Sequence, residues 1–394
     1  MQGKNSYRVS LGPFELVSLG LGGTIGSGIF VVPGIAAGIA GPSSILAWIF
    51  ASVSATCVMY SLAKTSYKHP STGAFYSIFS NVFGLKISIS LVLLYLISSV
   101  FAIATIAAGI GQYISASGFI DSSFVLPIEV VIIMVFCIIN IRGIYLSGML
   151  ENGLTILKVV PLVALAILLL PFIQDSNFFH VSASSTVGFL SVLVIVYWPF
   201  TGFEISAMTV EETKGGQKTV YKSLKIVMGI VVIVYLLLNI SLIGSLGSDI
   251  LADSPAPLAT AAGLISNEFK SAIGLIGIIA MLSALNAYMI GTARILQNIS
   301  SFFGFRLIKD LGSSGTPAVA TIVASFSACV MLLFFSNHFE ELANIAVVST
   351  LLPYIFVCIS AYKIFHNKKT KFIASIGAVS TSIIFAVYFL ILLV

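Results

Sequence analysis

The sequence predicts an all-α membrane protein, and three observations support this fold class. The 394-residue chain is 58% hydrophobic and 8% charged, with a mean hydropathy of +1.10, whereas soluble proteins carry about 25% charged residues. Its apolar stretches reach the roughly 20 residues that a helix needs to cross a bilayer. They lack the strict alternation of a membrane β-barrel, so we expect helical spans.

Eleven stretches qualify as membrane spans. By residue number they are 14–38, 43–63, 87–113, 124–141, 149–171, 187–209, 224–246, 270–293, 317–336, 341–364 and 372–394. The polar segments between them are too short to bury a core, so we expect no soluble domain. The loop after the seventh span is rich in alanine and leucine, which predicts a short helix starting near Pro255 or Pro257.

The basic residues predict which side of the membrane each loop faces. With the N-terminus in the cytoplasm, 17 of the 19 lysines and arginines fall in cytoplasmic loops, Lys270 falls outside and Lys158 lies within a span. This asymmetry follows the positive-inside rule. We therefore expect a multi-pass protein of the cell membrane with an extracellular C-terminus. The net charge of +5 would face lipid head groups, and the basic residues form no stripe with aromatics that would indicate a nucleic-acid partner.

The first span contains glycine where a membrane helix needs helix formers. Five glycines and a proline occur in GGTIGSGIFVVPG, residues 22–34. The sixth span, five spans later, carries a comparable interruption in VYWPFTGFEISAM, with Pro199 and Gly202 at its centre. Breaks at corresponding positions of two halves indicate an inverted repeat with a binding site at the breaks.

Broken helices at membrane depth have a specific chemical use, because unwound backbone there faces protein or a watery cavity. A break exposes N–H groups that suit a carboxylate and carbonyls that suit an ammonium group or a metal cation. An amino acid carries both charges on one carbon and would match such a site. Gly26 and Gly28 would permit close approach, and the hydroxyl of Ser27 could bond a carboxylate oxygen. Alternatively, these glycines are only packing notches between helices.

Several motifs resemble those of the amino acid–polyamine–organocation transporter family. The first-span signature is GTIGSGIFVVPG, and the eighth-span motif is SALNAYMIGTARIL. Residues 60–84 resemble the segment from the second to the third span, and residues 140–162 resemble the junction of the fourth and fifth. YWPFTGFEISAMTVEETK resembles the sixth span followed by a Glu-Glu motif. Together these motifs cover spans 1 to 10 in order.

The resemblance implies the LeuT-like fold, a pair of inverted five-span repeats with discontinuous spans 1 and 6. The repeats would occupy residues 12–171 and 187–365, with an additional span at 370–394. The usual member has twelve spans, one more than this sequence predicts. Family members move amino acids or related amines by alternating access, so the resemblance implies a transporter without a cofactor, whose partners are a small amino acid and the lipid bilayer. The oligomeric state stays open.

The resemblance also assigns roles at the first break. The backbone around Gly26 and Gly28, with the Ser27 hydroxyl, would hold the substrate carboxylate. Carbonyls near Thr24 and Ile25 would hold the α-ammonium group. The backbone N–H and C=O groups of residues 24–28 would therefore contact the substrate.

At the second break, the resemblance implies that carbonyls near Trp198 and Thr201 complete the ammonium site beside Gly202. Trp198 and Phe200 would lie against the substrate or control access to it. The alternative for this aromatic pair is ordinary packing in the helix bundle.

Lys158 lies about nine residues into the fifth span, on the order of 13 Å deep at 1.5 Å per residue. A charge at that depth is costly and suggests function; the alternative is snorkelling, although a lysine stem spans only about 6 Å. In proton-coupled family members a fifth-span lysine places its amine where sodium-coupled relatives hold a sodium ion, and Lys158 matches that position. It would contact a carbonyl near Gly23 and the hydroxyl of Ser283. We therefore expect the proton as coupling ion, without a sodium requirement or a resident metal.

Glu204 is a second charge at membrane depth. The resemblance implies a part in pH-dependent gating, and the alternative is a structural carboxyl that pins the broken helix. Glu15 and Glu129 lie near span ends and are expected at the membrane interface.

The residues favour a proton-coupled symporter of neutral L-amino acids, and an amino acid or amine exchanger is the alternative. Apart from Glu204 the expected pocket lacks an acid, and it would include the small third-span residues Ser98, Ser99, Ala102 and Thr105. A membrane enzyme would need a catalytic constellation, but the histidines lie in loops or at span ends, at positions 69, 180, 338 and 366. The sequence contains no Walker A motif, channel filter or signalling domain, and its four cysteines show no metal-ligand spacing.

Overall fold

The computed structural model describes residues 7, 9–71, 75–116, 118, 120–179, 186–312, 314–335 and 338–392. Within these ranges the regular secondary structure is helical. An isolated β-bridge pairs Leu11 with Thr213. His180 lies outside the described ranges, and so do residues 393–394, which end the last predicted span.

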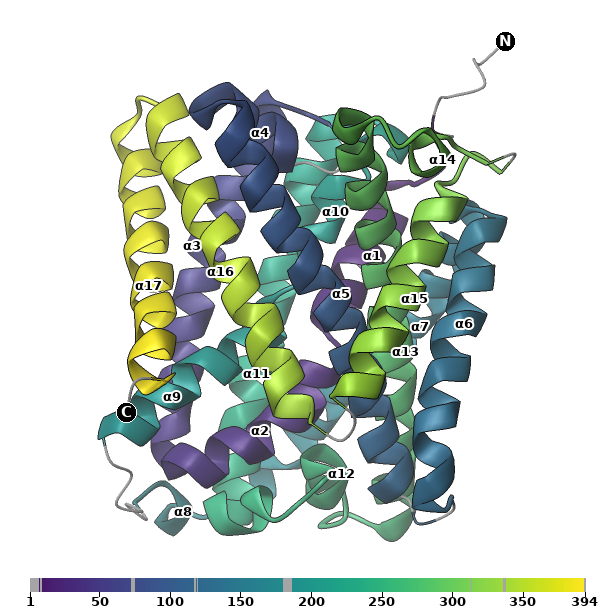
Figure 1. Ribbon diagram of the computed structural model, residues 1–394. Coiled ribbons are helices and arrows are strands. Elements are labelled where there is room, and N and C mark those ends of the chain that lie inside the picture. The colour runs from purple at the N-terminus through teal and green to yellow at the C-terminus, as the bar shows by residue number, and fades with distance from the viewer. Residues whose placement is uncertain are drawn as a thin grey trace.

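The long helices coincide with the predicted spans (Figure 1). They are α3 (Ser44–Lys68), α5 (Leu85–Ala116), α6 (Val125–Arg142), α7 (Ile144–Leu168), α11 (Gly216–Ala252), α13 (Asn267–Phe303), α15 (Ala318–Phe334), α16 (Phe339–Ile364) and α17 (Lys368–Leu392). The first and sixth spans are divided into α1 (Pro13–Thr24) and α2 (Ser27–Ala40), and into α9 (Thr186–Tyr197) and α10 (Ile205–Met208). Shorter helices are α4 (Phe75–Phe83), α8 (Ser176–Phe179), α12 (Pro257–Ala262) and α14 (Arg306–Lys309).

Length and apolar composition qualify eight helical stretches of the described chain as membrane-crossing, one of which runs from Pro13 to Lys68 across several helices. Two shorter apolar helices, Gly188–Phe200 and Ala318–Phe334, accompany them. An all-helical membrane protein is therefore confirmed. The count of eleven spans and the division into two five-span repeats stay predictions.

Two short elements refine the sequence-based picture. Helix α12 begins at Pro257, which confirms the expected short helix after the seventh span. Helix α4 was not expected: its apolar face buries Phe75, Ile78 and Phe79, while the rest of the helix is more accessible. A stretch of nine residues is too short to cross a bilayer, so a search for long apolar runs overlooks it.

The interior of the bundle holds the broken helices, and apolar side chains cover its outside. Every residue of α1 from Ser18 to Thr24 is buried, as α1 packs against α7, α11 and α13. Helix α6 lies at the periphery and exposes Val131, Met134, Val135 and Ile138. Apolar residues on the outer surface and backbone groups satisfied within helices are what a lipid environment requires.

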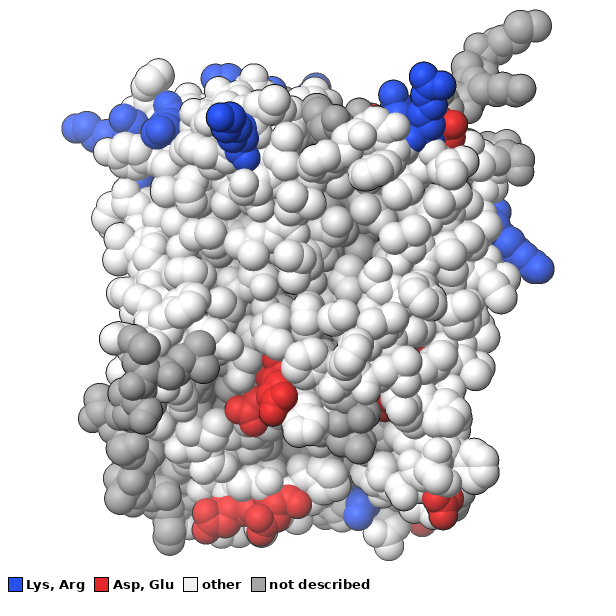
Figure 2. Space-filling model, in the orientation of Figure 1, with Lys and Arg blue, Asp and Glu red and all other residues white. Residues whose placement is uncertain are grey.

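Charges divide between the two ends of the bundle. Figure 2 shows lysine and arginine mostly at the end that carries α4 and α14, and aspartate and glutamate mostly in the opposite half, near α8 and α12. A broad belt between the ends has few charges on this face. We call the lysine- and arginine-rich end the basic end. Which end faces the cytoplasm stays a prediction.

Candidate functional site

The first span is interrupted at Ile25 and Gly26. Helix α1 ends at Thr24 and α2 begins at Ser27, and both intervening residues have non-helical backbone angles. Neighbouring helices press closely on this segment: a Cβ on Gly26 would lie 2.5 Å from the Cβ of Ala284 in α13. Glycine is required here because any side chain would collide with the opposing helix.

The sixth span unwinds over a longer stretch. Helix α9 gives way to a 3₁₀ turn over Trp198–Phe200, and Gly202 has a φ of +99° before α10 begins. A Cβ on Gly202 would lie 2.4 Å from the carbonyl oxygen of Gly23. The two unwound segments therefore touch backbone to backbone, and both interruptions fall where the sequence predicts them.

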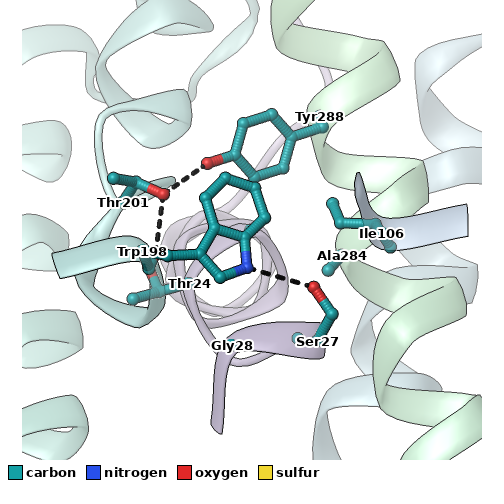
Figure 3. A pocket seen from close by; sticks show the side chains of 10 residues that line it. Thr24, Ser27, Gly28, Ile106, Trp198, Thr201, Ala284 and Tyr288 are labelled. Carbon is teal, nitrogen blue, oxygen red and sulfur yellow. Dashed lines mark hydrogen bonds between the residues drawn. The ribbon is translucent and has the colours of Figure 1, made fainter. Parts of the chain in front are cut away.

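A small cavity lies between the two breaks (Figure 3). Its lining combines backbone, hydroxyl groups and two aromatic rings: Gly23, Thr24, Gly26, Ser27, Gly28, Ile106, Trp198, Thr201, Ala284 and Tyr288. None of these side chains is charged.

Hydrogen bonds fix the polar walls of the cavity. The indole Nε1 of Trp198 donates to the Ser27 hydroxyl at 3.2 Å, so one break contacts the other across the cavity (Figure 3). The Tyr288 hydroxyl donates to Thr201 Oγ1 at 2.9 Å, and Thr201 Oγ1 donates to the carbonyl of Trp198 at 2.8 Å. The rings of Trp198 and Tyr288 stack with centroids 6.2 Å apart.

Six of the nine residues expected to bind substrate line this cavity: Thr24, Gly26, Ser27, Gly28, Trp198 and Thr201. Ile25, Phe200 and Gly202 do not. The Phe200 ring packs against Trp48 and Tyr235, with centroids 5.8 and 5.2 Å away, as the packing alternative describes. The role of each residue in binding stays a prediction.

The side wall of the cavity differs from the sequence-based expectation. Ile106, Ala284 and Tyr288 line it, whereas the small residues expected from the third span do not: Ser98, Ser99, Ala102 and Thr105. Ser98 instead bonds Thr350 and the carbonyl of Ala346 in α16. The sequence did contain a signal for two of the missed residues, because Ala284 and Tyr288 are four apart on one helix face within the eighth-span motif.

Lys158 is fully buried and does not snorkel to either surface. Its Nζ donates to the carbonyls of Gly22 at 3.1 Å and Ile25 at 2.9 Å, and to the Ser283 hydroxyl at 2.7 Å. The expected contact with Ser283 is present. The expected carbonyl near Gly23 is that of the adjoining Gly22, the carbonyl of Ile25 is a second acceptor, and Gly23 itself lines the cavity.

Sequence reasoning missed Glu151, a fully buried carboxyl beside Lys158. Its Oε1 accepts from Ser283, and its Oε2 accepts from Asn286 Nδ2 at 2.9 Å. The predicted fifth span begins at residue 149, which puts Glu151 at the membrane edge. Helix α7 begins at Ile144, so Glu151 lies about two turns inside.

Glu204 is also buried, and its contacts match the structural alternative. The Gly202 amide donates to its Oε2 at 3.0 Å, and the Tyr95 hydroxyl donates to its Oε1 at 2.5 Å. The carboxyl thereby holds the second break in place. A part in gating stays a prediction.

Glu129 is buried in the bundle, and its expected place at the depth of the membrane interface stays a prediction. It is 7% exposed, and its Oε1 would lie 1.6 Å from a Cβ on Gly111 of α5, so it fills the notch that this glycine leaves. The face of α6 that bears Glu129 points to α5. Glu15, in the first turn of α1, is half-buried.

A second polar cluster lies near the basic end. Arg294 of α13 and Glu212 form a buried two-bond ion pair, with Nε to Oε1 at 2.8 Å and Nη2 to Oε2 at 3.2 Å. The carbonyl of Glu212 accepts from the amides of Ser10 and Leu11, both at 2.9 Å. The segment before α1 is thereby fastened to the loop after α10.

Paired helix breaks that enclose an uncharged cavity at mid-bundle define a membrane transport protein. The sequence matches the family model described as amino acid permease over residues 11–394. The chain therefore belongs to the amino acid permease family.

Curated relatives agree with this family. The chain is 25% identical over 371 residues to the inner membrane transport protein YbaT of Escherichia coli, covering 92% of this chain and 85% of that protein. It is 26% identical over 389 residues to the branched-chain amino acid permease BcaP of Lactococcus lactis, covering 91% and 82%. It is 25% identical over 378 residues to the cadaverine/lysine antiporter of Escherichia coli, covering 89% and 82%. These relatives are transporters and permeases rather than enzymes.

Proposed function

We propose that this permease carries neutral L-amino acids by alternating access and couples their movement to protons. The observation that carries the proposal is the uncharged cavity at the crossing of two unwound helices. Its residues would act as the sequence suggests, with the start of α2 and the Ser27 hydroxyl toward the carboxylate. The first and sixth spans would move relative to the rest of an eleven-span, two-repeat fold.

The amine half of the site is more constrained than the carboxylate half. The Thr24 carbonyl accepts from the Tyr235 hydroxyl at 2.7 Å, the Ile25 carbonyl from Lys158, and the Trp198 carbonyl from Thr201. Each carbonyl oxygen has two lone pairs, so each retains the capacity for a second donor. An α-ammonium group would share these oxygens with the protein.

The lining favours a neutral substrate side chain. No acid faces the cavity to pair with a second amine, and Ile106, Ala284 and the stacked rings of Trp198 and Tyr288 supply apolar surface. A branched-chain permease among the relatives is consistent with this preference. The relationship to a cadaverine/lysine antiporter favours the second candidate, an amino acid or amine exchanger.

The contacts of Lys158 support proton coupling. An ammonium group has three N–H donors, and Nζ has three acceptors within 3.1 Å, on α1, on the break and on α13. A neutral amine has only two donors, so loss of the proton would release one acceptor. Protonation would therefore tie the first break to α13, and deprotonation would loosen it.

The test is uptake into proteoliposomes that contain the purified protein. A panel of labelled amino acids, with cadaverine included, is offered under a proton gradient, under a sodium gradient, or with unlabelled substrate inside. We expect neutral L-amino acids to accumulate with the proton gradient alone, and the Lys158→Ala variant to keep exchange while it loses accumulation. Lys270→Ala, an exposed lysine, is the matched control.

Two results would refute the proposed coupling. One is accumulation that requires sodium, and the other is undiminished proton-driven accumulation by Lys158→Ala. Transport of cadaverine against an amino acid, with no net uptake under any gradient, would establish the exchanger instead.

The orientation is a separate part of the proposal. We infer that the basic end faces the cytoplasm, because lysine and arginine in short loops are retained there. Cysteine labelling checks this: with Lys363→Cys and Lys270→Cys introduced singly into a background lacking the four native cysteines, a membrane-impermeant reagent applied to cells should label only the second.

A further inference from the structure

Glu151 is a buried charge that the proposed function leaves without a role. It lies seven residues before Lys158 on α7, so the two Cα atoms are about 10 Å apart along the axis and both side chains lie on one helix face. Both side chains are fully buried. An isolated buried charge is strongly disfavoured, so the two groups must be understood together.

A single hydroxyl connects the two. Ser283 of α13 accepts from the ammonium of Lys158 and donates to Oε1 of Glu151. The hydrogen bonds run in one direction, from nitrogen through hydroxyl to carboxylate. Along such a chain a proton can pass from the nitrogen to the carboxylate while the heavy atoms stay nearly in place.

The carboxylate is held firmly against the first span. A Cβ on Gly22 would lie 1.9 Å from Oε1 of Glu151, so the absence of a side chain at residue 22 makes room for the carboxylate. Gly22 also supplies a carbonyl to Lys158. The Thr155 hydroxyl of α7 lies 3.1 Å from the carbonyl oxygen of Ser18 in α1 and 3.4 Å from the same carboxylate oxygen, and its one proton serves either of these acceptors. The carboxylate and the ammonium group thus both touch α1.

Asparagine side chains fix the other oxygen. Asn286 Nδ2 donates to Oε2, and Asn140 Nδ2 of α6 donates to Asn286 Oδ1 at 3.1 Å. A carboxylate anion accepts this set of bonds without rearrangement, and after protonation Oε1 could return a proton to Ser283.

The other titratable groups on the helices around α7 are engaged elsewhere or exposed. On α13, Arg294 pairs with Glu212 and Tyr288 bonds Thr201. On α11, Tyr235 bonds the carbonyls of Thr24 and Pro199, and the lysines are exposed. On the remaining two helices, the groups are Glu129 against Gly111, the buried Cys137, the exposed Arg142 and the half-buried Glu15. Lys158 is therefore the charged group whose hydrogen-bond chain reaches Glu151.

We propose that Glu151 receives the proton of Lys158 through Ser283 and passes it toward the basic end of the protein. In this step an N–H bond of the ammonium breaks as the proton moves to Ser283 Oγ, and the former hydroxyl proton of Ser283 bonds to Oε1 of Glu151. The products are a neutral amine and a carboxylic acid, so charge is conserved. The inference rests on the proposed proton coupling and adds the acceptor that it lacks.

The transfer has a structural consequence. The two N–H donors of the neutral amine can still serve the carbonyls of Gly22 and Ile25, and the Ser283 hydroxyl, which now carries the former ammonium proton, donates to the amine, so the bonds persist but lose the charge that strengthened them. The carboxylic acid no longer attracts the amine as a carboxylate does. Both changes weaken the attachment of the first span to α7 and α13. Because Glu151 lies nearer the start of α7, at the basic end, it would hand the proton to that side.

The experiment compares Glu151→Gln with Glu129→Gln in proteoliposomes. Glutamine keeps the size of glutamate and one acceptor oxygen but cannot take up a proton. The probes are labelled L-leucine and L-alanine, with a pH-sensitive dye trapped inside to count protons. We expect Glu151→Gln to retain exchange within about threefold and to lose at least tenfold in proton-driven accumulation. Glu129→Gln, a buried carboxyl outside the chain of bonds, should behave like the unaltered protein.

A second pair of variants tests the hydroxyl and guards against misfolding of the first. Ser283→Ala removes the bridge and should also uncouple, whereas Ser283→Thr keeps a hydroxyl and should restore most of the accumulation. Infrared difference spectra of the purified protein between acid and alkaline buffer need no substrate. They should contain a carboxylic acid band that disappears in Glu151→Gln and persists in Glu129→Gln.

The outcomes separate the two proposals. If the unaltered protein fails to accumulate either probe or any other member of the panel with a proton gradient, the proposed coupling fails, and this inference with it. If the unaltered protein couples and Glu151→Gln moves the same number of protons per substrate, only the inference is overturned. A carboxylic acid band that survives in Glu151→Gln, with proton counts unchanged, assigns Glu151 a purely structural role as counter-charge.

Discussion

Two buried acid–base pairs contact helix α13, and their hydrogen bonds are arranged differently. Near the basic end, Arg294 and Glu212 meet directly through two parallel hydrogen bonds. Beside the first helix break, Lys158 and Glu151 are joined through the hydroxyl of Ser283. All four charged side chains are at most 2% exposed.

The difference lies in which pair can change its charge. Arginine stays protonated in proteins, and its planar fork suits a carboxylate, so the Arg294–Glu212 pair is a permanent link. Lysine releases its proton more readily when buried, and a bridging hydroxyl can conduct that proton. One pair is suited to fasten the loop after α10 to α13 and the other to respond to pH.

The largest effect on stability is expected at Arg294 and Glu212, which we call the direct pair. Arg294→Ala would leave the buried Glu212 carboxylate without a partner, which typically costs about 3–5 kcal/mol. The purified variant should show a much lower apparent Tm in detergent and a reduced yield of folded protein. Arg142→Ala, at an exposed arginine, is the control.

The double variant Arg294→Met with Glu212→Leu tests the explanation. It removes both charges and fills the space with apolar atoms, so it should recover most of the stability lost in Arg294→Ala. An Arg294→Ala protein as stable as the unaltered one would show that the direct pair does not fasten the loop.

The next largest effect is expected at Lys158 and Glu151, which we call the bridged pair. A substitution at a neighbouring glycine can disturb this pair without removing either charge. In Gly22→Ala the new methyl group would displace the Glu151 carboxylate, an overpacking that typically costs about 1–3 kcal/mol. We expect exchange to continue and proton-driven accumulation to fall sharply, as measured in proteoliposomes. Gly153→Ala on the same helix as Glu151 is the matched control, because a Cβ there meets nothing within 4 Å.

Should Gly22→Ala accumulate substrate as well as Gly153→Ala, the position of the Glu151 carboxylate against the first span would be irrelevant to coupling. The two pairs would then differ in construction but not in function.

A smaller effect is expected when the arginine fork is replaced by a single ammonium group. Arg294→Lys keeps the charge but loses one of the two bonds to Glu212, at a cost of about 1–2 kcal/mol. The apparent Tm should lie between those of the unaltered protein and Arg294→Ala, and proton counts per substrate should not change. A change in those counts would mean that a lysine at the direct pair also exchanges its proton, which would remove the distinction between the pairs.

Much of this fold was predictable from the sequence, because the bilayer imposes simple rules. Long apolar runs predicted the long helices, and glycine and proline at mid-span predicted both interruptions. The spacing could not place Glu151, since its depth depends on where α7 begins, and the chain turns sharply at Gly143 rather than at the edge of the apolar run. A sequence window reports hydrophobicity, whereas a helix end depends on backbone angles and caps.

The candidate site also combines features that the sequence predicts with features that it does not. Backbone-derived features were predictable, since glycines mark where helices unwind and touch. Side-chain features such as Ile106 and the orientation of Phe200 were not, because they depend on how far along α5 the cavity lies and on the rotation of the 3₁₀ turn about its axis. The predicted small residues Ser98 and Ala102 lie about two turns and one turn before Ile106 on α5, outside the cavity, and Ser98 there contacts α16.

The smallest effect is expected at the margin of the direct pair. Tyr7 donates to Gln297 Oε1 at 3.1 Å, three residues after Arg294 along α13. Tyr7→Phe removes this half-buried bond alone and should cost less than about 1 kcal/mol. Hydrogen exchange of the amides of Ser10 and Leu11 should quicken slightly, while accumulation and proton counts stay unchanged, because Glu212 still holds both amides through its carbonyl. If Tyr7→Phe alters the proton count, the segment before α1 belongs to the moving part of the transporter, and the direct pair is then part of the cycle instead of a fixed attachment.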